Sequence, residues 1–363
     1  MKKQNKTAVD LRRVKIIAEI GTSHRGSPSH ARELIEAAAE AGADCLKTQI
    51  VFADEIIHPN TGDVLLPGGL VSLYYRFREL EQDLDFYLEM KELTENCGMS
   101  FLASPFGIKS LGYIKELDCN EIKIASPELN HFPLLKAAAE TGKKLLLSTG
   151  VSTLSDIEAA LAVTGRKNTV IFHCITSYPA PEEEYNLSLL PIYRNLFGTA
   201  TGISDHSLDP CLVPAVSAAL GAGWIEKHFT LSETGGGLDD PIALSFSAFL
   251  KMTEIVRRTE AAETPLEMLK AELGRKRIEA VLGNGVKRLA PSETANYGRT
   301  NRSIHALSEL SAGEVLTEDN TALLRTEKKL RPGLRPEFHN IIIGRKLKRP
   351  VGSGEGIIWD DIQ

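Results

Sequence analysis

Cysteine is scarce in this sequence of 363 residues. The five cysteines are scattered, their number is odd, and no Cys-x-x-Cys arrangement occurs; they are Cys45, Cys97, Cys119, Cys174 and Cys211. A disulfide framework is therefore not expected. We interpret the five as reduced thiols that mostly pack in the core of a cytoplasmic protein.

Long apolar runs are also missing. No run reaches the roughly 20 residues that a membrane-spanning helix needs, so we expect no membrane partner. Residues 1–6 are charged and lack the apolar stretch of a secretory leader, so no signal peptide is predicted.

Concentrated positive charge and nucleotide-binding patterns are absent too. The formal net charge is −6 and no basic run occurs, which argues against a nucleic-acid partner. Any anionic ligand must then be held by cations that converge locally. No G-x-x-x-x-G-K-S/T or G-x-G-x-x-G pattern is found, so no nucleotide cofactor is predicted.

The sequence does contain a regular succession of short apolar segments, and most of them end in a polar or charged residue. They span 14–19, 44–49, 99–104, 121–126, 144–148, 168–174, 200–206 and 223–228. Each is followed by a helical pattern. Eight strand–helix units in this length predict an α/β fold of the (β/α)₈ TIM-barrel type, whose active site lies at the C-terminal strand ends.

Helical periodicity and turn residues divide the rest of the chain. Helices are predicted at 29–41, 84–97, 107–116, 131–141, 153–164, 186–196, 209–221 and 245–261, with a last one at 265–281 outside the barrel. Residues 52–82 do not fit a tight connection. They are interpreted as a long loop over the barrel mouth that carries substrate contacts.

The C-terminal part is predicted to be a separate unit. A barrel domain over 1–282 is followed by a linker at 283–301, rich in Gly, Pro, Ser, Thr and Asn, and by a small, mostly β domain at 302–363. Short β-like runs are expected at 303–306, 314–316, 341–344 and 356–359. With little core of its own, this domain should dock on the barrel or on a neighbouring subunit.

Two histidines stand at the ends of adjacent predicted strands. His206 follows the seventh strand and His228 the eighth, so both imidazoles can face one divalent cation that keeps open positions for water and substrate. The alternative is that each is a hydrogen-bonded core residue; the pairing on neighbouring strands favours the metal. Asp205 and Glu226 could orient the imidazoles or hold a metal-bound water.

Two lysines, Lys47 and Lys123, end the second and fourth predicted strands, where burial is costly unless an anion is bound. One interpretation is a Schiff-base nucleophile. The other is a clamp for a phosphate and a carboxylate, and hydroxyl groups at other strand ends favour it; they belong to Ser104, Ser126, Ser148 and Ser204.

Ordered motifs along the chain give a more specific indication. They are Ile17-Ala18-Glu19-Ile20-Gly21, Lys47-Thr48-Gln49, Lys123-Ile124-Ala125-Ser126, Leu147-Ser148-Thr149-Gly150, Ser177-Tyr178-Pro179, Ser204-Asp205-His206 and Glu226-Lys227-His228-Phe229. In this order they resemble the sialic acid synthase family. Three further motifs resemble the antifreeze-like (SAF) domain of that family: Arg302-Ser303-Ile304, Ala312-Gly313-Glu314 and Arg331-Pro332-Gly333.

The resemblance implies condensation of phosphoenolpyruvate (PEP) with an open-chain N-acylated hexosamine, giving a nonulosonic acid and phosphate. It implies that His206 and His228 bind Mn²⁺ or Mg²⁺, and that PEP is held by Lys47, Lys123, Ser104, Ser126, Ser148 and Ser204. It assigns sugar contacts to Glu19, Gln49, Tyr178 and Asp239. It also implies a homodimer with exchanged C-terminal domains, in which Arg331 reaches the partner's sugar.

The chemistry needs a group that helps water to capture the positive charge at C2 of PEP, and Glu226 or Glu128 is a candidate. With Glu19 and Asp239 these form the predicted catalytic set. Ser23 and Arg25 stand where the family usually has asparagines, and the strand-two loop has Pro67-Gly68-Gly69-Leu70 where the family usually has Gly-Asn. In the family the asparagine of that loop contacts the sugar, so the predicted acceptor is N-acetylmannosamine or a modified or 6-deoxy analogue. Three alternatives remain. The first is a PEP-dependent aldolase-like enzyme that acts on a phosphorylated sugar, the second is a Schiff-base aldolase, and the third is a non-catalytic carbohydrate-binding protein.

Overall fold

The computed structural model describes residues 13–66, 69–233, 235–327 and 329–363. Eight parallel strands close into a barrel in the order β1, β2, β5, β6, β7, β8, β9, β10 and back to β1. Their bounds are β1 (Lys15–Gly21), β2 (Cys45–Ile50), β5 (Ser100–Pro105), β6 (Glu121–Ile124), β7 (Lys144–Ser148), β8 (Thr169–Cys174), β9 (Ala200–Asp205) and β10 (Trp224–His228). The predicted TIM barrel is confirmed.

The period-2 alternation of the strands fills the barrel interior in two layers. Apolar side chains form the lower layer, in one buried cluster of Ile17, Cys45, Leu102, Leu146, Val170, Phe172 and Trp224. Two positions further along the same strands the side chains are polar, as in Glu19, Lys47, Ser148 and Glu226. The alternation that packs the bottom of the barrel therefore presents polar groups at its mouth.

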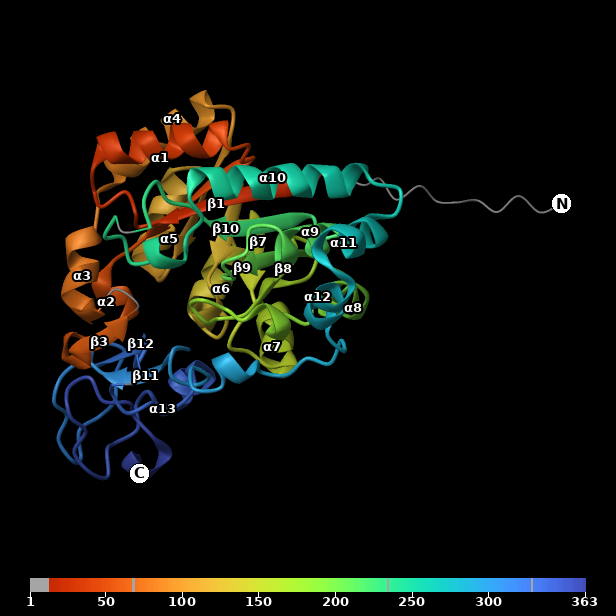
Figure 1. Cartoon of the computed structure of the whole chain (residues 1–363). Helices are drawn as coiled ribbons and strands as arrows, with labels where there is room; N and C mark the ends of the chain where they lie inside the picture. The colour runs from red at the N-terminus through yellow and green to blue at the C-terminus, as the bar shows by residue number, and fades with distance from the viewer. Residues whose placement is uncertain (1–12, 67–68, 234, 328) are drawn as a thin grey trace.

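Helices surround the barrel close to their predicted positions (Figure 1). They are α1 (Pro28–Glu40), α4 (Leu84–Asn96), α5 (Ile108–Glu116), α6 (Phe132–Ala139), α7 (Leu154–Thr164), α8 (Leu189–Phe197), α9 (Leu212–Ala219) and α10 (Phe246–Ala261). The single helix predicted at 265–281 is wrong: α11 (Pro265–Leu273) and α12 (Arg275–Leu282) are separated by Gly274, whose φ of 94° interrupts the helix.

The segment predicted as a long loop at 52–82 carries regular structure instead. It contains α2 (Ala53–Ile56), η1 (Pro59–Thr61), the antiparallel pair β3 (Asp63–Leu66) and β4 (Gly69–Ser72), and α3 (Leu73–Leu80). Leu73, Phe77 and Leu80 fall on one face of α3 and are buried. Leu73 and Phe77 pack with Phe106, so the segment forms a structured apolar cover at the barrel mouth.

The C-terminal domain has a small core of its own, which includes Ile304, Leu316 and Ile357. It contains the antiparallel pair β11 (Ser303–Ala306) and β12 (Thr321–Leu324), and the short α13 (His339–Ile342). The run at 303–306 is confirmed, but 314–316 and 356–359 form only isolated bridges and 341–344 overlaps α13. The predicted pattern missed β12.

The segment predicted as a linker, 283–301, packs against the barrel rather than lying free of it. Glu293 in the turn η5 (Pro291–Glu293) is fully buried, and its carboxylate accepts hydrogen bonds from Val151 N (2.8 Å) and Thr176 N (2.6 Å). These amides follow β7 and β8, so the segment ties two strand ends together. The boundaries at 282 and 302 stay a prediction.

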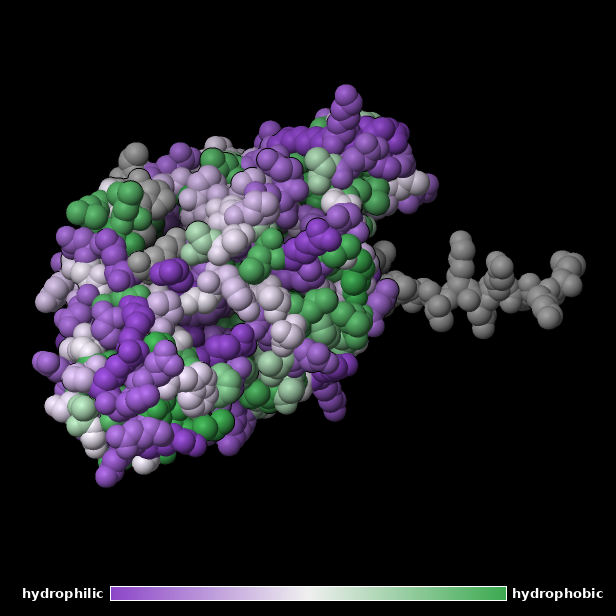
Figure 2. Space-filling view, turned by 90° about the horizontal axis from the view of Figure 1, so that it is seen from below, coloured by the Kyte–Doolittle hydropathy of each residue, from purple (hydrophilic) through white to green (hydrophobic). Residues whose placement is uncertain are grey.

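The surface seen from below in Figure 1 is mainly hydrophilic, with smaller hydrophobic groups between the polar ones (Figure 2). Within the described ranges, no helix combines the length and the apolar character that crossing a membrane requires. The prediction about a signal peptide falls on residues 1–6, which lie outside the described residues. The cytoplasmic location stays a prediction.

Candidate active site

A cavity of about 500 Å³ opens at the C-terminal ends of the barrel strands. The α3 segment and the C-terminal domain contribute to its wall through Leu73, Phe77 and Arg325. Most of the predicted site residues line it: Glu19, Lys47, Gln49, Lys123, Ser126, Ser148, Tyr178, Ser204, His206, Glu226, His228 and Asp239. The other three predicted site residues, Ser104, Glu128 and Arg331, are not part of its wall.

Buried charges of alternating sign cross the floor of this cavity. Lys47 Nζ lies 2.6 Å from Glu19 Oε2 and 3.5 Å from Glu226 Oε1. Lys123 Nζ lies 3.2 Å from Glu226 Oε2 and donates to Ser148 Oγ at 2.5 Å. The Glu226 carboxylate thus bridges the two lysines, and each lysine has a second partner on its other side.

The environment shifts the pKa of each of these groups. Burial by itself would raise the pKa of Glu226, but Lys123 and Lys47 hold it at about 2. Burial would lower the pKa of Lys47, but Glu19 and Glu226 raise it above its usual value. For Lys123 burial dominates, and its pKa is lowered. Lys47 is therefore a fixed cation, and Lys123 is the lysine that more readily loses its proton.

Replacing Glu226 by glutamine is expected to destabilise the protein by about 3–5 kcal/mol near neutral pH, because two buried lysines lose their shared counter-charge. The folded pKa of about 2 is below the ordinary value of 4.5, so the stabilisation by Glu226 is complete above pH 4.5 and is lost as the pH falls toward 2. Urea unfolding of wild type and Glu226→Gln from pH 7 downward should show a shrinking difference. A difference in unfolding free energy that stays constant with pH would contradict this prediction. Glu158→Gln, at an exposed position, is the control and should show no such pH-dependent difference.

The two histidines face each other across the ends of β9 and β10. Their ring centroids are 5.5 Å apart, and Tyr178 stacks on His206 at 4.4 Å. His206 Nδ1 lies 2.7 Å from the carbonyl oxygen of Ile175, and donation from Nδ1–H would leave Nε2 free for a ligand. Burial and the charge of His206 keep the pKa of His228 well below its usual value, which favours the neutral form that binds metals. Burial would lower the pKa of His206 too, but Cys174 raises it to about 9, so a metal would have to displace a proton from His206.

This donor set fits a divalent cation with open coordination positions. In the described part of the chain no three His, Cys, Asp or Glu side chains converge as a complete metal site. The histidine pair offers two protein ligands, and water and substrate would have to complete the shell. The metal site stays a prediction. Asp239 lies nearby, with Oδ2 at 3.9 Å from His228 Nδ1.

Asp205 stabilises the loop that carries His206 from the side that faces away from the cavity. Its carboxylate accepts from Lys227 Nζ (2.6 Å) and from Ser207 N (2.8 Å), and it is not part of the cavity wall. Lys227 also donates to the Ser207 carbonyl, so the strand end of His228 is tied to the loop of His206. Asp205 therefore orients one metal-ligand candidate through the backbone and does not face the cavity.

The part of the cavity at the ends of β1 and β2 is built around Gly21. Gln49 Nε2 donates to Glu19 Oε1 at 2.9 Å, and Asp239 lies across from both. Gly21 has a φ of 52°, and a Cβ there would come within 3.1 Å of Asp239 Oδ2 and 3.2 Å of Gln49 Nε2. Glycine is thus required both by the backbone conformation and by the close approach of these side chains.

The serines occupy different positions. Ser148 and Ser126 face the cavity, and Ser126 Oγ accepts from Gly150 N at 3.0 Å, which joins the ends of β6 and β7. Ser204 also lines the wall. Ser104 is buried, and no hydrogen-bond partner is found for its hydroxyl among the described residues.

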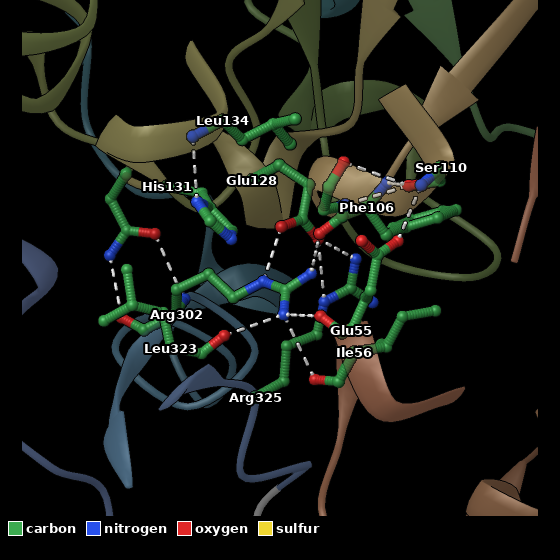
Figure 3. A network of polar contacts seen from close by, with 12 residues as sticks. Glu55, Ile56, Phe106, Ser110, Glu128, His131, Leu134, Arg302, Leu323 and Arg325 are labelled. Carbon is green, nitrogen blue, oxygen red and sulfur yellow. Dashed lines mark hydrogen bonds and ion pairs between the residues drawn. The ribbon is translucent and has the colours of Figure 1, made fainter. Parts of the chain in front are cut away.

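Two predicted site residues make other contacts. Both carboxylate oxygens of Glu128 are paired with arginines of the C-terminal domain, Arg302 and Arg325 (Figure 3). Arg331 donates to the Gly356 carbonyl and to Asp361 Oδ2, each at 2.7 Å, inside its own domain. In this chain the structure brings neither residue into the cavity.

Sequence reasoning missed Arg325, the arginine by which the C-terminal domain reaches the cavity. It directly follows β12, the strand that was not predicted, and it forms a parallel bridge with Ile57 after α2. Its only signal in the sequence is a cation after a short apolar run, Thr321–Leu324, which is too weak to separate it from other surface arginines.

Comparisons with known proteins agree with the fold and the site. The NeuB family model matches residues 34–266, and the SAF domain model matches 301–363. The spore coat polysaccharide biosynthesis protein SpsE of Bacillus subtilis is 34% identical over 99% of this chain and 96% of its own length. Its crystal structure gives a TM-score of 0.80 at 32% identity, covering 97% of this chain and 95% of that chain.

Two relatives are named for their activity. The N,N'-diacetyllegionaminic acid synthase of Campylobacter jejuni is 32% identical over 93% of this chain and 98% of its own length. The pseudaminic acid synthase of Helicobacter pylori is 28% identical over 96% of this chain and 98% of its own length.

The barrel, the charged cavity at its mouth and these matches together define a (β/α)₈-barrel enzyme of the synthase type with a C-terminal SAF domain. The chain belongs to the NeuB family. The resemblance to the sialic acid synthases that the sequence motifs indicated is thereby confirmed.

Proposed function

We propose that this enzyme condenses PEP with an N-acylated hexosamine, N-acetylmannosamine or a modified or 6-deoxy analogue, to give a nonulosonic acid and phosphate. The observation that carries the proposal is the cavity floor, where two buried lysines and serine hydroxyls lie beside two facing histidines. The names of the relatives, which are acid synthases, support the same class of product.

The lysine side of the cavity suits PEP. Lys47 and Lys123 supply two cations, and the hydroxyl groups of Ser126, Ser148 and Ser204 supply neutral donors around them. Charge-assisted hydrogen bonds from this set would hold the phosphate and carboxylate of PEP and would stabilise phosphate as it leaves. Ser104 is not part of the cavity wall, and its assignment to PEP stays a prediction from the resemblance.

The opposite side suits an acyl sugar. Glu19, Gln49, Asp239 and Tyr178 offer polar partners for hydroxyl groups. Phe77, Phe106, Leu73 and Leu238 form an apolar wall that would accept an acyl methyl or a deoxy position. Arg325 lines the cavity and would make the sugar contact that was expected from Arg331.

His206 and His228 would hold Mn²⁺ or Mg²⁺, which when bound supplies the Lewis acidity that polarises the sugar aldehyde. The chain's own residues would position the reacting water. Glu226 lies ionised between the lysines at the cavity wall, where its carboxylate can accept a hydrogen bond from the water that captures C2 of PEP and orient it. It is better placed than Glu128, which is not part of the cavity wall and is paired with two arginines of the C-terminal domain.

A Schiff-base aldolase is a second candidate, and one observation favours it. Burial lowers the pKa of Lys123, as a nucleophilic lysine requires. Against it, Lys123 is held by Glu226 and Ser148, and Lys47 lies in the same cluster, which is the arrangement of an anion clamp.

Phosphate release from PEP, measured with Mn²⁺ across N-acetylmannosamine, its 6-deoxy and diacetamido analogues, and no sugar, tests the proposal. We expect release that depends on one sugar and stops with a chelator. Release without any sugar, or release that persists with chelator, would contradict it. No release with any sugar from a folded, metal-loaded protein would favour another acceptor or a non-catalytic carbohydrate-binding role.

The homodimer with exchanged C-terminal domains stays a prediction. Within the chain described here, the C-terminal domain contacts its own barrel through Arg302, Arg325 and Arg335. Sedimentation of the full chain would establish whether it associates.

A further inference from the structure

Arg302, at the start of the C-terminal domain, is completely buried against the barrel mouth (Figure 3). Its Nε donates to Glu128 Oε2. Its Nη2 donates to the Phe106 carbonyl at 2.8 Å, and its Nη1 to the carbonyls of Glu55 and Leu323, the latter at 3.0 Å. Every nitrogen of the guanidinium thus has a partner, as a buried cation requires.

The barrel partners of Arg302 lie on three different loops at the active-site end. Glu55 belongs to α2 after β2, Phe106 follows β5, and Glu128 ends the turn η2 (Ser126–Glu128) after β6. All three connections contribute to the cavity wall: the one after β2 through Phe77, the one after β5 through Phe106 and the η2 turn through Ser126. One side chain therefore joins neighbouring loops that shape the cavity.

The backbone around Arg302 is tied to the same place. Asn130, two residues beyond Glu128, accepts from Arg302 N at 3.1 Å and donates to the Arg302 carbonyl at 2.9 Å. Arg325 pairs with the other oxygen of Glu128 and lines the cavity itself. The C-terminal domain thus contacts the η2 turn and the residues after it through arginine side chains and through the backbone of Arg302.

We propose that Arg302 is a positioning residue through which the docked C-terminal domain sets the geometry of the PEP-binding loops. The inference rests on the proposed function, because Ser126 is assigned there to PEP. The docked domain fixes Glu128, Glu128 fixes the η2 turn, and the turn fixes the Ser126 hydroxyl, which also accepts from Gly150 N. Only the planar fork of arginine reaches acceptors on all three loops at once.

The experiment compares full-length variants by steady-state kinetics with PEP and the sugar. Arg302→Met and Arg302→Lys are expected to raise KM for PEP roughly 10- to 100-fold, the effect of misplacing a binding group by about 1 Å. The matched control is Arg335→Met, which removes another ion pair between the domains (2.8 Å to Asp156) that does not touch the three loops. Its KM for PEP should remain within about twofold of wild type.

Hydrogen exchange separates positioning from a merely structural role. Amides at 53–57, 106–108 and 125–130 should exchange faster in Arg302→Lys and keep wild-type rates in Arg335→Met. If Arg302→Met does not fold, Asn130→Ala provides the test, since it leaves the guanidinium paired and removes only the backbone contacts. It should also raise KM for PEP.

The outcomes separate this inference from the proposed function. If the wild type neither binds PEP nor releases phosphate from it, the proposed function fails. If the wild type is active but Arg302→Lys and Asn130→Ala keep its KM for PEP and its exchange rates, the inference is overturned and the proposed function stands.

Discussion

Replacing His228 by alanine is expected to lower the rate of condensation by about 10³-fold or more while the barrel stays folded. The imidazole ends β10 at the cavity wall, facing His206 at a centroid distance of 5.5 Å. Because the pair offers only two ligands, losing one leaves a single imidazole to hold the cation, and the sugar aldehyde would no longer be polarised. Because His228 lies in the cavity wall, the substitution enlarges an existing cavity and does not open a new one in the core, so the fold should be kept.

Three measurements check this prediction. Phosphate release follows activity, Mn²⁺ binding by electron paramagnetic resonance follows the site without any turnover, and circular dichroism follows the fold. His30→Ala on α1, away from the cavity, is the control and should behave as wild type in all three. Full activity together with wild-type Mn²⁺ affinity in His228→Ala would remove the metal assignment.

Replacing Lys123 by methionine is expected to lower kcat/KM for PEP by about 10²–10³-fold, the effect of removing one preorganised electrostatic donor. Lys123 Nζ joins Glu226 to Ser148, so the change removes a cation and also frees the serine hydroxyl. Glu226 keeps only Lys47, 3.5 Å away, and the pKa of Glu226 should rise. The loss should therefore appear both in PEP affinity and in stability.

Calorimetric titration with PEP measures the first effect and urea unfolding the second. Lys143→Met is the matched control, because that lysine pairs at the surface with the exposed Asp118. Unchanged PEP affinity in Lys123→Met would contradict the clamp. Trapping of wild type, but not of Lys123→Met, by borohydride with a carbonyl substrate would favour the Schiff-base aldolase.

The site was largely predictable where it follows strand alternation. Ile17 and Glu19, or Leu146 and Ser148, differ by two positions, so placing the apolar member in the barrel core places the polar member at the mouth. The order of the strands then determines which strand ends lie side by side. The proximity of His206 and His228 could be predicted from this order alone, because β9 and β10 pair directly.

Other features depend on contacts between distant segments, which no local pattern records. Glu128 looks like any carboxylate at a strand end, yet it is paired with Arg302, 174 residues further along the chain. Residues 52–82 contain loop-like Pro and Gly, and their hairpin and α3 are stabilised by packing against Phe106.

The sequence by itself determined the barrel, the order of its strands and the inward-facing polar ring, because all three follow from the period-2 alternation and from right-handed strand–helix units. Only the tertiary structure decided that Arg325 and not Arg331 faces the cavity of this chain, and that Arg302 joins three of its loops. Those choices depend on how the C-terminal domain docks. Docking is decided by which buried charges find partners across the interface, and not by any periodicity within one segment.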